Sequence, residues 1–263
     1  MLSKLIKYDI KSMLKFISVF YILGIFFAIL TRIFFSFDNS LMLRIIGEIT
    51  SGAAISMMIS ILINNLMRSW VRLKNTLYDD ESYLTHTLPI DKKTIYLSKV
   101  ITSFLVMLIS FVFIAIILFI AYYSKANIET LKNILFPIAT LLNSTVIKFL
   151  FIIFFLVFLE LFSILLCGFL GIIIGHIFNK NKIVYSVVFG FISYMITQIM
   201  VVLIILIISL FNKDLMNIFI SNEINNMSVL SNVSIISIII YTVLIIINMF
   251  ISIKIFKKGV NVD

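Results

Sequence analysis

Long apolar runs alternate with short polar segments along the whole chain. About 20 apolar residues are needed to cross a hydrocarbon core that is about 30 Å thick. Six runs reach roughly that length, and each is predicted to be a helix, because lipid offers no partner to an unpaired backbone amide. The six runs are Phe16–Phe37, Ile49–Met67, Val100–Tyr123, Phe149–Phe178, Ile183–Phe211 and Val233–Ile253.

One further uncharged segment, Asn133–Ile147, is short for a crossing and contains Pro137. It could be a seventh span, a re-entrant hairpin or an amphipathic cap on the outer surface. The distribution of basic residues favours six spans, because with both termini inside, 15 of the 21 lysines and arginines lie on the cytoplasmic side. A seventh span would move the last five of these outside, against the positive-inside tendency.

Residues 1–16 have the pattern of a helix that lies on a membrane surface. At 100° per residue, four lysines fall within an arc of roughly 80°, and apolar residues occupy the opposite face. The alternative is a cytoplasmic extension of the first span. Asp9 interrupts the apolar face, so we expect it to pair with a base such as Arg68, Arg72 or Lys74. The other possibility is that the helix rolls and leaves Asp9 in water.

A polar segment of about thirty residues, 68–99, separates the second run from the third. Asp79, Asp80 and Glu81 stand in a row there. Either aspartate can cap a short helix that begins near Glu81, and Pro89 would stop that helix, because proline disfavours helical geometry in the residue before it. Asp91 would then cap the helix that leads into the third span.

Composition supports a membrane protein. Hydrophobic residues make up 62% of the 263 positions and charged residues only 13%, whereas soluble domains carry about 25% charge. The net charge of +9 lies at the ends of the apolar runs, so anionic lipid of the inner leaflet is a better partner than nucleic acid. The predicted fold is an all-α integral membrane protein. It has an interfacial helix and six transmembrane helices, with both termini cytoplasmic.

The segment Glu81-Ser-Tyr-Leu-Thr-His-Thr-Leu-Pro-Ile90, followed by Tyr96-Leu-Ser-Lys99, resembles permease subunits of bacterial type-2 ATP-binding-cassette exporters. The opening Lys4-Leu-Ile-Lys-Tyr-Asp9 and the six-span layout extend the resemblance over the whole chain. It implies a single transmembrane domain over 1–263. Its parts would be an interfacial helix at 1–16, a cytoplasmic coupling segment at 68–99 and extracellular loops at 124–148 and 212–232.

The resemblance also implies partners. A coupling helix after the second span would dock in a cleft of a separate ATPase, and two permease subunits, identical or related, would form the pathway in a bacterial cell membrane. This chain has no G-x-x-x-x-G-K-[ST] phosphate loop, so ATP and Mg²⁺ would be bound by the partner. A protein interface commonly has aromatic or aliphatic side chains at its centre and charged side chains around them, and this segment contains both kinds. The candidate ATPase-coupling residues are Asp79, Asp80, Glu81, Tyr83, Leu84 and His86.

Enzymatic activity of the chain itself is not expected. The two histidines, His86 and His176, are too far apart in sequence for an H-E-x-x-H metal site, and no G-x-S-x-G nucleophile motif occurs. We predict no metal site and no cofactor in this chain.

Glu160 is the sole charge in the run from Phe149 to Phe178. Carboxylates inside a membrane are costly and usually face a partner, a cavity or a bundle interior. Glu160 is therefore a candidate for the substrate pathway. The alternative is a structural Glu that is protonated or bonded to Asn64, Asn65 or Gln198.

Gly168, Gly171 and Gly175 follow in the same run, and the last two form a GxxxG pattern that lets helices approach closely. The contact could be within the subunit or between two subunits, and internal packing is the simpler interpretation.

The expected function is export of an apolar or amphipathic cargo by an ATP-driven complex, with a small antimicrobial or cytolytic peptide favoured. A drug or a lipid is an alternative cargo. A protein of another class, a non-transporting membrane immunity or scaffold protein, is the alternative function.

Overall fold

The computed structural model describes residues 2–37, 40–79, 81–87, 89–141, 144–211, 216 and 228–258; the side chains at 86, 141 and 228–232 are not described. Within these residues the structure is all-helical, as the sequence predicted. Six of the helices are long and apolar enough to cross a membrane. The helices are α1 (Leu2–Phe35), α2 (Leu41–Leu77), α3 (Ser82–Thr87), α4 (Lys92–Tyr122), α5 (Lys125–Leu141), α6 (Val146–Gly175), α7 (Lys182–Leu210) and α9 (Ser228–Lys258).

The described chain forms two compact units that divide between Ile128 and Glu129. The expected single transmembrane domain stays a prediction. The 212–232 segment falls almost entirely outside the described residues, apart from Met216 and the start of α9.

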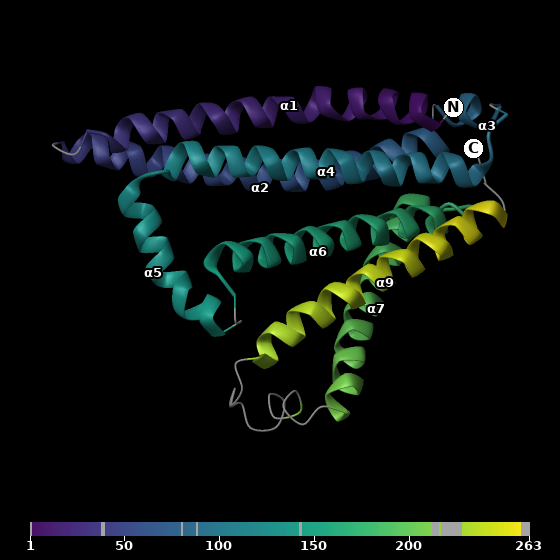
Figure 1. Ribbon diagram of the computed structural model, residues 1–263. Helices are drawn as coiled ribbons and strands as arrows, with labels where there is room; N and C mark the ends of the chain where they lie inside the picture. The colour runs from purple at the N-terminus through teal and green to yellow at the C-terminus, as the bar shows by residue number, and fades with distance from the viewer. Residues whose placement is uncertain are drawn as a thin grey trace. The chain divides into compact units, whose positions relative to one another are not determined.

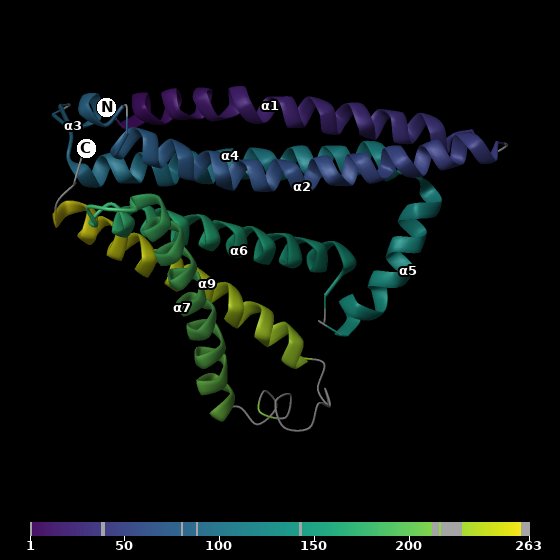
Figure 2. The same cartoon turned by 180° about the vertical axis from the view of Figure 1, so that it is seen from behind.

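In the first unit, α1, α2 and α4 lie side by side, and both views show this (Figures 1 and 2). Apolar side chains from all three helices form its core, which includes Ile17, Ile61 and Val106. A buried polar group lies among them: the Tyr21 hydroxyl is 2.7 Å from the Ser110 hydroxyl, to which Asn65 also donates at 2.7 Å. This group fixes the register of the three helices, because a slip of any one would leave a buried polar atom unpaired.

The helix α1 is continuous from Leu2 to Phe35, so the structure does not separate residues 2–16 as an interfacial helix. The interfacial position of residues 1–16 stays a prediction. One buried stripe explains the continuity: it runs at spacings of three and four residues through both parts of α1. Its members are Asp9, Met13, Ile17, Tyr21, Gly24, Ala28 and Thr31.

The expected outer loop at 124–148 is mostly helical, because α5 occupies Lys125–Leu141. Its 17 residues fall short of a crossing helix, and Pro137 lies inside it. In the second unit, α6 packs against both α7 and α9.

Candidate functional site

The connection between α2 and α4 places α3 close to the end of α2. The Tyr78 N–H donates to the Lys74 carbonyl at 2.8 Å, and the Glu81 N–H donates to the Asn75 carbonyl at 3.2 Å. Tyr78 is itself buried, and this burial raises the pKa of its phenol. The tight turn leaves little slack between the last turn of α2 and the first residue of α3.

Asp79 does not cap α3 with its side chain, which was one of the two predicted possibilities. Its backbone carbonyl accepts the Ser82 N–H at 2.8 Å, while its carboxylate pairs with Lys74 at 2.9 Å. The side chain is engaged by the base on α2, so the main chain makes the contact with α3. Asp91 does precede α4, and its backbone carbonyl accepts from Thr94 and Ile95, but its side chain makes no capping bond.

The short helix α3 has one buried and one exposed side. Ser82 and Thr85 are 3% and 8% exposed, three residues apart on the inner side. Tyr83 and Leu84 are 76% and 68% exposed. Both the N–H and the hydroxyl of Thr85 bond to the Glu81 carbonyl, at 3.0 and 2.9 Å, which holds the helix to the residue that precedes it. The helix therefore presents an aromatic and an aliphatic side chain outward from a fixed base.

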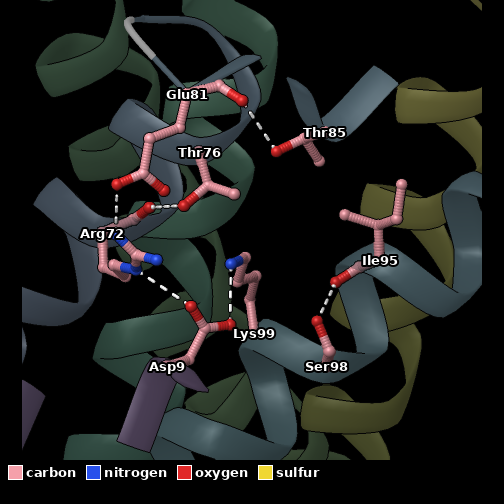
Figure 3. Close-up of polar contacts among 8 residues, drawn as sticks. All are labelled: Asp9, Arg72, Thr76, Glu81, Thr85, Ile95, Ser98 and Lys99. Carbon is pink, nitrogen blue, oxygen red and sulfur yellow. Dashed lines mark hydrogen bonds and ion pairs between the residues drawn. The ribbon is translucent and has the colours of Figure 1, made fainter. Parts of the chain in front are cut away.

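Four charged side chains lie beneath α3 in a continuous series (Figure 3). Asp9 of α1 accepts from the Nζ atom of Lys99 at 2.7 Å and from the Nε atom of Arg72 at 2.9 Å. Another nitrogen of Arg72 donates to Glu81 at 2.7 Å. We call Asp9, Arg72, Lys99 and Glu81 the ion network. It joins α1, α2 and α4 to the residue immediately before α3.

The ion network is buried at its centre and more exposed at its end. The side chains of Asp9 and Lys99 are 2% and 4% exposed, that of Arg72 is 11% exposed, and that of Glu81 is 42% exposed. The network as a whole pairs two acids with two bases, and Glu81, the second acid, lies at its exposed end. Such a cluster is not in itself strong evidence of stability, but removing one member leaves a buried charge without its partner. The geometry can therefore hold α3 in a defined position relative to three long helices.

Two aromatic rings add to the attachment of α1 to α2. The Arg72 guanidinium lies 5.5 Å from the ring centre of Tyr8, and that of Arg68 lies 5.0 Å from the ring centre of Phe16. These are cation–π distances, typically worth about 0.5–2 kcal/mol depending on desolvation.

The expected pairing of Asp9 with a base of the polar segment is confirmed, with Arg72 as one partner. Lys99 was not among the predicted partners. Its signal lies in the helical pattern, since it follows Ile95 by four residues and precedes Thr102 by three, and both are buried on the same side of α4. A buried lysine needs an acidic partner, and the buried Asp9 carboxylate likewise needs a basic one.

The structure describes four of the six predicted coupling residues. Asp79 and Glu81 form ion pairs with α2, whereas Tyr83 and Leu84 project outward. Asp80 and the side chain of His86 lie outside the described residues.

Glu160 lies in a second polar group, within the unit that contains α6, α7 and α9. One of its oxygens accepts from the Gln198 amide at 2.7 Å and from the Tyr194 hydroxyl at 3.1 Å. The Tyr241 hydroxyl of α9 donates to the side-chain amide oxygen of Gln198 at 3.3 Å. The other oxygen of Glu160 is buried and has no hydrogen-bond partner among the described residues. Of the three partners considered from the sequence, Gln198 is the one that the structure brings to Glu160.

The glycines of α6 lie against α7 of the same chain. A Cβ atom added at Gly171 would be 2.4 Å from the Gly190 nitrogen, and one added at Gly175 would be 2.5 Å from the Ser186 nitrogen. The Cα atom of Gly168 faces Gly190 as well. These contacts are within the subunit, and they require glycine at 171 and 175 because backbone atoms occupy the space of a side chain.

The described part of the chain contains no group of three or more His, Cys, Asp or Glu residues that could hold a metal ion. The site that the structure shows is an exposed surface on α3, with Tyr83 and Leu84, next to ion pairs that link Glu81 to α1, α2 and α4. Searches against protein-family models, curated proteins and solved structures find no match to this chain.

Proposed function

We propose that this chain is the membrane-spanning subunit of an ATP-driven exporter in a bacterial cell membrane, and that α3 docks on a separate cytoplasmic ATPase. The observation that carries the proposal is a short helix with exposed Tyr83 and Leu84, preceded directly by Glu81, which a series of ion pairs links to three long apolar helices. The sequence resemblance described above supports the same assignment.

Two features of α3 explain how docking could act on the long helices: its exposed side chains and its link to the ion network. Exposed aromatic and aliphatic anchors gain binding free energy when a partner desolvates them. A displacement of the docked partner would pass through Glu81 and Arg72 to Asp9, and so reach α1 and α4 as well as α2. The chain lacks a phosphate loop, so the partner supplies ATP and Mg²⁺ binding and hydrolysis.

A complete pathway would be formed by two such subunits, identical or related, with one ATPase beneath each. The favoured cargo is a small antimicrobial or cytolytic peptide, because a chain with so few polar residues suits an apolar or amphipathic molecule better than a polar one. Glu160 is the proposed polar contact for this cargo, because carboxylates inside a membrane usually face a partner, a cavity or a bundle interior.

The test is purification of the full chain from its native cells in mild detergent, followed by mass spectrometry of the proteins that accompany it. We expect a soluble polypeptide with a phosphate loop. The double substitution Tyr83→Ala and Leu84→Ala should reduce its recovery about tenfold or more, because two anchors of this kind cost at least about 1–2 kcal/mol each when truncated.

A matched control is the double substitution Leu41→Ala and Met42→Ala. These residues are 78% and 73% exposed and belong to the start of α2, so they remove similar apolar surface away from α3. Equal recovery of the ATPase with both double variants would refute the docking role of α3. Absence of any ATPase from the wild-type preparation in several detergents would favour the immunity or scaffold alternative.

Cargo is tested separately, by ATP-dependent uptake of labelled peptide into inside-out vesicles that contain the chain and its ATPase. Glu160→Gln keeps an acceptor for Tyr194 and Gln198 but removes the charge. We expect slower uptake at unchanged ATPase binding. Wild-type uptake by this variant would remove Glu160 from the pathway.

A further inference from the structure

A hollow of about 820 Å³ lies in the first unit, at the ends of α1 and α4 and the start of α2. It is lined by residues from these helices and by the first residues of α5. Its volume falls in the range of small-molecule and cofactor sites, roughly 300–1,000 Å³. Neither the ion network nor α3 contributes to the lining.

The lining combines two arginines with one acid. Arg32 belongs to the last turn of α1, whereas Arg44 and Glu48 belong to the start of α2. One nitrogen of Arg32 donates to the Tyr123 carbonyl, which fixes the guanidinium at the edge of the hollow. A guanidinium has five N–H donors, so Arg32 retains donors for a ligand.

Arg44 also has donors that could bind a ligand. Its Nε atom is 3.8 Å from Glu48, which is an ion pair but is longer than a hydrogen bond, and the two side chains are 76% and 66% exposed. Pairs of this kind contribute little stability, so a ligand can displace or share the contact at small cost.

Part of the remaining wall is aromatic, and small or polar residues (Ser36, Ala121, Ser124, Ala126 and Asn127) form the rest. Phe34, Phe35 and Phe37 line the same hollow as the arginines. A ligand that fits must therefore offer an anionic group to the guanidinia and an apolar part to the rings. Because these residues stand where apolar helices end, the hollow lies at the height of the headgroup layer in a membrane.

We propose that this hollow binds the headgroup of a membrane phospholipid. Arg32 and Arg44 donate to the phosphate oxygens, since guanidinium matches phosphate in charge and geometry. The phenylalanines contact the glycerol and the first acyl carbons. Glu48, close to Arg44, accepts from a headgroup ammonium, so a zwitterionic headgroup such as phosphatidylethanolamine is favoured over phosphatidylglycerol. The inference is independent of the proposed export function.

The test is native mass spectrometry of the full chain in mild detergent during titration with phosphatidylethanolamine. The double variant Arg32→Gln and Arg44→Gln should bind the lipid at least about tenfold more weakly, because each hydrogen bond to a charged group contributes about 1.5–3 kcal/mol. The single variant Arg44→Gln, which leaves the Arg32–Tyr123 contact intact, should show part of this loss. It keeps the proposal testable if the double variant does not fold.

The matched control is Lys125→Gln. Lys125 is exposed and adjacent to Ser124 and Ala126, which line the hollow, but it does not line the hollow itself. Unchanged lipid binding by the Arg44→Gln variant, or equal loss with Lys125→Gln, would overturn the proposal.

Two further experiments identify the ligand. Inorganic phosphate at millimolar concentration should not displace the lipid, and displacement would assign the hollow to a soluble phosphate instead. Glu48→Gln should abolish the preference for phosphatidylethanolamine over phosphatidylglycerol. A preference that persists in this variant would refute the role of Glu48.

Discussion

Asp9 connects two buried bases at the level of single residues. It is 2% exposed, and its two oxygens serve different partners, Arg72 and Lys99. Arg72 has a second acid, Glu81, whereas Lys99 depends on Asp9 as its only ion-pair partner within 4 Å among the described residues. The loss of the Asp9 charge should therefore affect Lys99 most.

Asp9→Asn should lower the free energy of unfolding of the first unit by about 3–5 kcal/mol, the usual effect of removing one partner from a buried ion pair. Unfolding can be followed by the fluorescence of Trp70, the single tryptophan, which lies on α2 two residues before Arg72. Asp79→Asn is the control, because its pair with Lys74 is about one third exposed and should contribute less than about 1 kcal/mol.

A double variant tests whether Asp9→Asn destabilises the first unit by leaving Lys99 without its partner or by altering side-chain packing. The double variant Asp9→Asn and Lys99→Met removes both members of the pair and leaves Arg72 bound to Glu81, so it should recover part of the lost stability. Unchanged stability of Asp9→Asn, or no recovery in the double variant, would contradict the assignment.

The sequence allowed part of this network to be predicted. A carboxylate in the middle of an apolar helix face requires a partner, and Arg72 was among the candidates. The contribution of Lys99 depends on α1 and α4 being adjacent, which periodicity along one helix does not show. Asp79 or Asp80 was predicted to cap α3 through its side chain; Asp80 lies outside the described residues, and the carboxylate of Asp79 pairs with Lys74 of α2 instead.

The helix α1 shows how the limits of elements differ from the limits of apolar runs. The apolar run begins near Phe16, but the helix begins at Leu2. A change in hydropathy does not end a helix when the buried stripe continues, and here Asp9, Met13 and Ile17 continue it at a spacing of four. The six apolar helices could be predicted from length and composition, whereas the continuity of α1 required the packing of α2 and α4.

The contact of α6 with α7 gives a prediction at the scale of two helices. Gly171→Ala would place a Cβ atom 2.4 Å from a backbone nitrogen and 2.5 Å from the Ser186 carbonyl oxygen, so the helices must separate. We expect a loss of about 1–3 kcal/mol in the stability of the second unit. The measurement is the reaction of Cys167, the single and buried cysteine of α6, with a thiol-specific dye during heating.

Gly190→Ala is the control in the same interface. Its Cβ atom would be 3.6 Å from the nearest atom, which is an ordinary contact, and alanine favours a helix over glycine by up to about 1 kcal/mol. This variant should unfold at the wild-type temperature or above it. Equal destabilisation by the two substitutions would show that the close approach at Gly171 is not specific.

At the scale of the whole molecule, the number of crossings decides which ends of the helices face the cytoplasm. The helix α5 has 17 residues, which at 1.5 Å per residue gives about 25 Å, less than a hydrocarbon core of about 30 Å. It also carries Lys125, Glu129 and Lys132. Both properties favour six crossings, with α3 and the α6–α7 connection on the same side of the membrane.

Single cysteines in a Cys167→Ser background test this orientation with a membrane-impermeant maleimide on intact cells. Exposed positions are available in each segment, so reactivity reports the side of the membrane rather than burial. We expect Leu41→Cys to react from outside, and Thr87→Cys and Lys180→Cys to react only after permeabilisation. Reaction of Lys180→Cys from outside would mean that α5 crosses. Reaction of Thr87→Cys from outside would place α3 on the wrong side to meet a cytoplasmic ATPase, and the proposed function would fail even if Tyr83 and Leu84 bound another protein.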